Sequence, residues 1–148
     1  MKRLFNIRFG VVAKALIALC FTALLPLFAA DKAAKEAFDR GLTATAQGNM
    51  QEAIKQFTQA IKIDPKYAKA YYNRGVVYEK IGDYKQAISD YNQAIKVDPN
   101  FAWAYNNRAS AYISLNDYKN ATKDARKACE LGDCKALYYL AQNKLLRD

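Results

Sequence analysis

Apolar residues recur every three or four positions through residues 34–135, which is the spacing of amphipathic helices. Short breaks interrupt the pattern at QGN (47–49), IGD (81–83) and LND (115–117). A glycine or asparagine in each break can adopt the left-handed conformation that ends a helix. Asn49, Asp83 and Asp117 can then cap a second helix by accepting hydrogen bonds from its free amides. The pattern therefore predicts a series of helical hairpins.

The hairpins repeat at a spacing of 34 residues, which separates Gly41 from Gly75 and Pro65 from Pro99. Three consecutive copies are predicted, at residues 34–67, 68–101 and 102–135, and they are expected to stack on one another to share a core. Because proline cannot continue a helix, the second helices of the first two copies should end at the DP pairs, 64–65 and 98–99. In the third copy Gly132 can supply the turn. Residues 136–148 are predicted to form one further helix that caps the stack.

Small side chains mark the positions where two helices must approach closely. In the first helices these are Gly41, Gly75 and Ala109. A larger side chain at such a position would cost about 1 to 3 kcal/mol of overpacking. Tyrosines are expected to fill the remaining space between the helices. Asp90 and Asp124 in the second helices are expected to lie on the outer face, where they would serve solubility.

The second copy carries the most specific pattern. Its characteristic residues are Tyr71, Gly75, Tyr78, Ala87, Tyr91, Ala94 and Pro99. With these residues the chain resembles the tetratricopeptide repeat family, over about seven-tenths of its length. The outer copies depart from the pattern, as terminal copies commonly do, at Ala37, Ala44, Ala125 and Asp133. The resemblance implies an all-α fold, a right-handed α-solenoid of three hairpins with a C-terminal capping helix.

In this family the first helices of successive repeats line a concave groove that binds a peptide or protein segment. The resemblance implies that the groove positions here are Phe38, Leu42, Lys69, Tyr72, Asn73, Val76, Trp103, Asn106, Asn107 and Ser110. Asparagine carries both a donor and an acceptor, so Asn73 and Asn107 are expected to bind the backbone of an extended peptide. Phe38, Tyr72 and Trp103 are expected to contact its side chains. For Phe38 and Tyr72, packing between hairpins stays open as the alternative.

Some family members hold the terminal carboxylate of a chaperone with lysine, arginine and asparagine side chains in this groove. The present chain matches that arrangement only at Asn73. Phe38, Trp103 and Asn107 stand where the basic residues belong. A carboxylate without a cation has little to hold it, so we do not expect a chaperone of this kind as the partner.

The first thirty residues form a different segment, which is predicted to be a signal peptide (1–30). A basic start and an apolar stretch over residues 15–28 precede the first acidic residue, Asp31. We therefore expect export, with the bacterial periplasm as the destination. One alternative is a retained inner-membrane anchor, because Leu27 or Phe28 stands where cleavage prefers a small residue. The other is a lipoprotein modified at Cys20, although its neighbours do not fit that motif.

Charge and composition narrow the function. The chain of 148 residues has a formal charge of +9, but residues 31–148 hold 19 basic and 14 acidic residues that are spread along the sequence, so no nucleic-acid partner is expected. There is no histidine, and no glycine-rich phosphate loop or nucleophile elbow. We predict a non-enzymatic interaction scaffold without cofactor, metal or small-molecule substrate, which binds a protein or peptide of the cell envelope. The alternatives are a self-associating structural protein and, if the N-terminal segment is retained, a membrane-anchored assembly factor.

Two further cysteines, Cys129 and Cys134, flank a predicted glycine turn. In an exported chain thiols oxidise, so a local disulfide between them is expected. A zinc site would need more ligands than the chain offers, and redox centres favour two intervening residues. The disulfide would attach the capping helix to the third copy.

Overall fold

The computed structural model describes residues 29–147, which form helices and no strand. A first helical segment covers residues 29–46. It is followed by α2 (Met50–Ile63), α3 (Ala68–Lys80), α4 (Tyr84–Val97), α5 (Ala102–Ser114), α6 (Tyr118–Glu130) and α7 (Lys135–Gln142). The predicted signal peptide falls outside the described residues, apart from Ala29 and Ala30.

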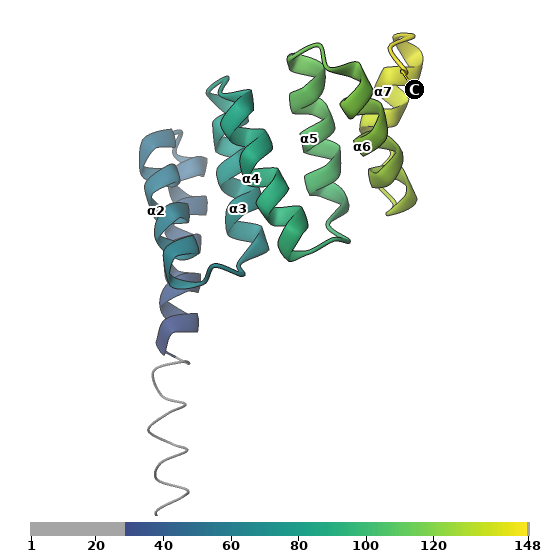
Figure 1. Cartoon of the computed structure of the whole chain (residues 1–148). Coiled ribbons are helices and arrows are strands. Elements are labelled where there is room, and N and C mark those ends of the chain that lie inside the picture. Colours follow the sequence, from purple (N-terminus) through teal and green to yellow (C-terminus); the bar gives the residue numbers. More distant parts are fainter. Residues whose placement is uncertain (1–28, 148) are drawn as a thin grey trace, which may run out of the picture.

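The helices follow one another across the molecule in sequence order, as Figure 1 shows. Among the helices α2 to α7, contacts are most extensive within the hairpins α3–α4 and α5–α6, and α4 joins the two hairpins by packing on α5. The first helices also meet along one side, since α3 contacts α5 and α5 contacts α7. The chain is therefore an all-α solenoid, as predicted.

The turn inside each hairpin has the geometry that the breaks predicted. Gly48, Gly82 and Asn116 have positive φ angles of 75°, 83° and 60°. In each case the next residue donates its amide to the carbonyl five positions back, as Asp83 does to Tyr78 at 2.9 Å. This pairing satisfies carbonyls that the helix end leaves free. The same geometry recurs at Gly132, where φ is 98°.

The second helices begin at the predicted caps. The side chains of Asn49, Asp83 and Asp117 accept hydrogen bonds from the backbone amides three residues later. After α2 and α4, the chain leaves the helix at Asp64 and Asp98, which are extended, before Pro65 and Pro99. Sequence signals alone therefore determine where these helices start and end.

The interior of the first two hairpins is built on a glycine against an aromatic ring. A Cβ atom added at Gly41 would lie 2.6 Å from Phe57, and one added at Gly75 would lie 2.7 Å from Tyr91. Phe57 and Tyr91 are both completely buried. The third hairpin has alanines at both equivalent positions, Ala109 and Ala125, and both are buried in one cluster with Leu140 of α7.

The aspartates of the second helices are not on the outer face, so the prediction for Asp90 and Asp124 was wrong. Each is only 4% exposed. Asp90 accepts two hydrogen bonds from Arg74, at 2.8 and 2.7 Å, and Asp124 accepts two from Arg108, both at 2.7 Å. The arginine of the first helix draws the carboxylate inward because the two bonds offset the loss of its hydration.

The last helix is shorter than predicted. We expected a helix over residues 136–148, but α7 covers only Lys135–Gln142. Lys144 adopts a positive φ of 56°, and Leu145 donates its amide to the carbonyl of Leu140 at 2.9 Å. Leu145 also packs against the buried cluster of the third hairpin. The burial of Leu145 and this helix-ending turn direct the chain back toward α6.

A disulfide joins Cys129 at the end of α6 to Cys134 just before α7, as predicted. Asp133, inside this short link, is buried and donates its amide to the carbonyl of Ala128 at 2.8 Å. The link and the helix-ending turn together fix where α7 begins.

Candidate functional site

The predicted groove residues lie on the first helices, and we call them together the first-helix surface. They come from the segment 29–46 (Phe38, Leu42), from α3 (Lys69, Tyr72, Asn73, Val76) and from α5 (Trp103, Asn106, Asn107, Ser110). Because α3 contacts α5 and α5 contacts α7, this surface continues from the second repeat to the C-terminal helix.

The largest exposed apolar group of this surface is Trp103, which is 60% exposed. Its ring centroid is 6.3 Å from that of Phe101, and Phe101 is 4.9 Å from Tyr72. The three rings form a continuous aromatic row between α3 and α5. Trp103 at its outer end offers an apolar face to a partner, and the indole can also donate a hydrogen bond.

Tyr72 has a structural role in addition to any contact with a partner. Its ring packs on Tyr91 at 5.9 Å and on Phe101, and its hydroxyl oxygen accepts a hydrogen bond from the Asn107 amide at 3.1 Å. Burial raises the pKa of the Tyr72 phenol, so the hydroxyl keeps its proton. The side chain thus joins the second repeat to the third.

Phe38 packs in the same way one repeat earlier. Its ring centroid is 4.9 Å from Tyr67 and 5.6 Å from Phe57. Both Phe38 and Tyr72 are half-buried. They therefore pack between hairpins, as the alternative assignment expected, and present only part of each ring at the surface.

The two asparagines that were expected to bind a peptide backbone each have one donor engaged within the protein. Asn73 donates to the carbonyl of Lys69 at 2.8 Å, and Asn107 donates to Tyr72. The Asn73 side-chain amide keeps an oxygen and a second N–H, whereas the Asn107 amide also interacts with the Tyr91 hydroxyl and keeps its oxygen. These bonds hold the two amides in fixed orientations, which lowers the entropy lost on binding.

The Asn106 side chain forms a hydrogen bond within the protein. Its side-chain oxygen accepts a hydrogen bond from the amide of Ala136 at 2.9 Å, which fixes the first turn of α7 against α5. Beside this bond lies a shallow cavity of about 350 Å³, lined by Asn106, Ser110, Ile113, Ser114, Lys135, Ala136 and Tyr139. Asn106 thus helps to shape the C-terminal end of the first-helix surface.

The remaining predicted residues are more scattered. Leu42 and Lys69 are exposed, whereas Val76 is half-buried and packs against the cluster that holds Tyr91. The contribution of α7, where Lys135 and Tyr139 line the cavity, was not predicted from the sequence. Ala136 and Leu140 mark the buried stripe of that helix, and Tyr139, three residues after Ala136, lies at the edge of this stripe and is 50% exposed.

Within residues 29–147 no three His, Cys, Asp or Glu side chains come together in a way that could hold a metal ion. In the same part of the chain no helix is both long and apolar enough to cross a bilayer.

Solved structures with the same fold include several peptide complexes. The first TPR domain of Spaghetti (RPAP3) bound to an HSP90 peptide matches with a TM-score of 0.73 and 26% identity, over 77% of this chain and 92% of that one. The TPR2B domain of yeast Sti1 in a complex with pHsp70 matches with a TM-score of 0.67 and 30% identity, over 77% and 93%. The protein MamA matches with a TM-score of 0.67 and 32% identity, over 72% and 62%.

A comparison with curated proteins found no match. Family models of the tetratricopeptide repeat match residues 68–101 and 90–123, and a TPR repeat model matches residues 41–82. The match over residues 68–101 coincides with the hairpin α3–α4, and the other two matches each extend over parts of two neighbouring hairpins. The chain belongs to the tetratricopeptide repeat family.

Proposed function

We propose that this protein is a non-enzymatic interaction scaffold that binds an extended peptide segment across the first-helix surface. The observation that carries the proposal is Trp103, a large apolar side chain that stays 60% exposed at the end of an ordered aromatic row. Tryptophan is enriched among residues that dominate binding energy. Structural neighbours of the chain hold peptides, which supports the same use of the fold here.

The chemistry of the surface specifies the kind of segment. Trp103 suits an apolar or aromatic side chain of the partner, and the amides of Asn73 and Asn107 suit its backbone. Where other family members place cations for a terminal carboxylate, this chain has Phe38, Trp103 and Asn107. The proposed partner is therefore an internal segment recognised by its backbone and an apolar anchor, rather than a chaperone C-terminus.

The proposed location is the cell envelope, and it rests on the N-terminal sequence alone. A basic start and an apolar stretch over residues 15–28 are typical of export signals. Fractionation of cells into cytoplasm, periplasm and membrane, followed by determination of the N-terminal residue, tests this part. A periplasmic protein that starts near Asp31 supports it, and an intact cytoplasmic chain contradicts it.

The test of the binding face is capture of partners from solubilised envelope extract with matched variants. Trp103→Ala and Asn73→Ala change the first-helix surface, whereas Tyr138→Ala removes an exposed aromatic ring from α7 outside it. We expect the partner to be lost with Trp103→Ala, weakened with Asn73→Ala and retained with Tyr138→Ala. A partner retained by every variant of native helicity would show that binding uses another face.

Self-association is a second candidate, favoured by the outer side of α7. Tyr138 is 67% exposed and Tyr139 is 50% exposed at the end of the stack. A second copy that packed on this end would cover both rings. Sedimentation velocity over a range of protein concentrations decides the matter. A sedimentation coefficient that rises with concentration and stays constant in Tyr138→Ala supports it, and a constant value for the parent protein excludes it.

A further inference from the structure

One carboxylate lies on the first-helix surface that the groove prediction did not include. Glu79, near the end of α3, follows Val76 by three residues and Tyr72 by seven. Residues at this spacing share one face of a helix. The side chain of Glu79 is half-buried, as are those of Val76 and Tyr72. The groove face of α3 therefore ends in an acidic side chain.

A network of hydrogen bonds holds this carboxylate in place. Glu79 accepts a hydrogen bond from the Tyr91 hydroxyl at 2.7 Å. The Tyr91 hydroxyl also interacts with the side-chain amide of Asn107, which donates to the Tyr72 hydroxyl at 3.1 Å. The four side chains come from α3, α4 and α5, so the network joins the second repeat to the third. A carboxylate that is already oriented loses less entropy when a partner binds it.

The negative charge of Glu79 is not neutralised by an ion pair. Among residues 29–147, none of the ion pairs involves it, and the adjacent Lys80 is exposed. A carboxylate has about four positions for hydrogen-bond donors, and the Tyr91 hydroxyl occupies one of them. Burial raises the pKa of the Tyr72 and Tyr91 phenols, and the Glu79 carboxylate raises both further. The negative potential of Glu79 therefore extends over the network.

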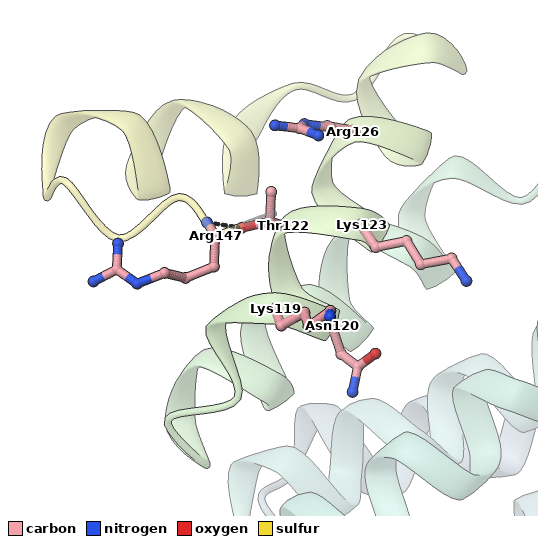
Figure 2. A pocket seen from close by; sticks show the side chains of 6 residues that line it. All are labelled: Lys119, Asn120, Thr122, Lys123, Arg126 and Arg147. Atoms are coloured by element: carbon pink, nitrogen blue, oxygen red, sulfur yellow. Dashed lines mark hydrogen bonds between the residues drawn. The ribbon is translucent and has the colours of Figure 1, made fainter.

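A group of basic side chains lies elsewhere, beside α6. The tail returns to this helix, where the backbone amide of Arg147 donates to the Thr122 hydroxyl at 3.0 Å. Figure 2 shows the basic side chains that surround Thr122: Lys119, Lys123, Arg126 and Arg147. Among the helices α2 to α7, α6 makes no contact with α3. These cations are therefore not placed to pair with Glu79.

We propose that Glu79 selects a lysine or arginine side chain in the peptide segment that binds the first-helix surface, an inference that rests on the proposed function. A half-buried carboxylate without an ion pair attracts a cation, and charge-assisted hydrogen bonds are stronger than neutral ones. The partner is then recognised at two points. Trp103 contacts an apolar side chain of the segment, and Glu79 binds a basic one.

The chain offers matched variants for the test. Glu79→Gln removes the charge and keeps an oxygen that can accept the hydrogen bond from Tyr91. Glu130→Gln, the control, removes one acidic charge at the exposed end of α6, where Glu130 pairs with Lys127. Trp103→Ala reports on the proposed function itself. Thermal unfolding monitored by circular dichroism shows which variants fold as the parent does.

Random linear peptides displayed on phage are selected on the full chain and on each variant. We expect the parent protein to enrich peptides that contain both an apolar residue and a lysine or arginine. The basic residue should no longer be enriched on Glu79→Gln, and it should remain enriched on Glu130→Gln. The apolar residue should no longer be enriched on Trp103→Ala.

One selected peptide is then synthesised with its basic residue and with glutamine in that place, and isothermal titration calorimetry measures both affinities. For the parent protein we expect this exchange to weaken binding by at least about fivefold, and by less at high salt. For Glu79→Gln we expect less than about a twofold effect, because the charge that binds the basic residue is absent. The measurement on the parent protein needs no variant and stands even where Glu79→Gln fails to fold.

The outcomes separate this inference from the proposed function. Peptides that depend on Trp103 but show no enrichment of basic residues would overturn the role of Glu79 and leave the proposed peptide binding intact. The same conclusion would follow from an exchange to glutamine that costs equal affinity in the parent and in Glu79→Gln. A selection that enriches no peptide on the parent, or only peptides that bind Trp103→Ala equally well, would contradict the proposed function and this inference with it.

Discussion

An arginine recurs at the same position in every repeat. Its hydrogen-bond partner differs between the copies in charge and burial, so we expect its contribution to stability to differ as well. Arg40, Arg74 and Arg108 are 34 residues apart, and each donates to a side chain 16 residues later. In the first copy that partner is the neutral Gln56, at 2.9 Å. In the other two it is a buried aspartate. Arg74 also reaches back to Thr58 of the preceding repeat, so the pair links hairpins as well as helices.

Arg74→Ala is expected to lower the free energy of unfolding by about 3 to 5 kcal/mol, because it leaves the buried Asp90 carboxylate without its partner. Arg40→Ala is the control, and it should cost only about 1 kcal/mol because Gln56 is uncharged. Urea unfolding monitored by circular dichroism measures both. Equal losses in the two variants would show that the charged pair contributes no more than the neutral one.

In the first two hairpins, a glycine in the first helix faces an aromatic ring in the second helix. In the second copy Gly75 leaves room for Tyr91, whereas in the third copy alanine stands at both places. Alanine normally stabilises a helix by about 1 kcal/mol relative to glycine. At Gly75, where the ring is present, we expect this preference for alanine over glycine to be reversed.

Gly75→Ala is therefore expected to destabilise the protein by about 1 to 3 kcal/mol, because the new Cβ would lie 2.7 Å from the Tyr91 ring. The same exchange in the other direction, Ala109→Gly, should also destabilise, by about 1 kcal/mol, because the equivalent position in the second helix holds Ala125 instead of a ring. Chemical unfolding of both variants is the measurement. A stabilising effect of Gly75→Ala would contradict the packing described here.

At the scale of elements, α7 depends on small residues of the third hairpin and on two constraints at its N-terminal end. Leu140 of α7 is buried in the same cluster as Ala125. Ala125 stands at the position where the other two copies carry an aromatic ring. The Cys129–Cys134 disulfide holds its start, and the Asn106 side chain holds its first turn. The departures of the third copy from the family pattern therefore make room for the last helix.

Reduction of the disulfide, or the double substitution Cys129→Ser with Cys134→Ser, is expected to lower the free energy of unfolding by about 2 kcal/mol, since the bond closes a short loop of the unfolded chain. Hydrogen exchange should accelerate in α7 more than in α3 and α4. The comparison of oxidised and reduced protein in urea measures the first effect. Unchanged exchange in α7 after reduction would contradict the proposed role of the disulfide.

At the scale of the whole molecule, tyrosines that are buried or half-buried among the helices must stay protonated. Burial raises the pKa of Tyr67, Tyr72, Tyr91 and Tyr112 above the ordinary value of 10.0. For Tyr91, which is completely buried, the nearby Glu79 carboxylate raises the pKa further, and the hydroxyl donates to that carboxylate at 2.7 Å. The folded chain therefore holds these protons more tightly than the unfolded chain does.

These raised pKa values make the folded chain less stable at alkaline pH. Stability is fully present below about pH 10, where the unfolded tyrosines are protonated, and it falls as the pH rises above that value. Urea midpoints between about pH 8 and pH 11 should decrease, with a smaller decrease in Tyr91→Phe. A midpoint that stays constant over this range, or that falls equally in Tyr91→Phe, would contradict the assignment.

The sequence predicted the hairpins, their caps and the disulfide because each rests on a local rule. Glycine, proline and capping residues act within a few positions, so Gly82, Asp83 and Pro99 mark helix ends without reference to the rest of the fold. The burial of Asp90 was not predictable in this way, because it depends on an arginine 16 residues away on another helix. The return of the tail to Thr122 depends on tertiary packing of Leu145 and was missed for the same reason.

In the candidate site, too, some features were predictable from the sequence and others depend on tertiary structure. The spacing of the repeats placed Trp103 and Asn107 on the first helices, and both lie there. The engagement of Asn106 with α7 and of Asn107 with Tyr72 required the three-dimensional arrangement of three helices. Sequence periodicity can assign a residue to a helix face, but it cannot show which of its polar atoms are already bonded.

The central claim, that a peptide segment lies across the first-helix surface, is tested most directly by site-specific photocrosslinking in living cells. A photoreactive phenylalanine derivative replaces Trp103 in one strain and Tyr138 in another. The account predicts one discrete crosslinked partner from position 103, with the crosslink mapped to an internal segment, and none from position 138. The same partner crosslinked only from position 138, or no crosslink from position 103, would contradict it.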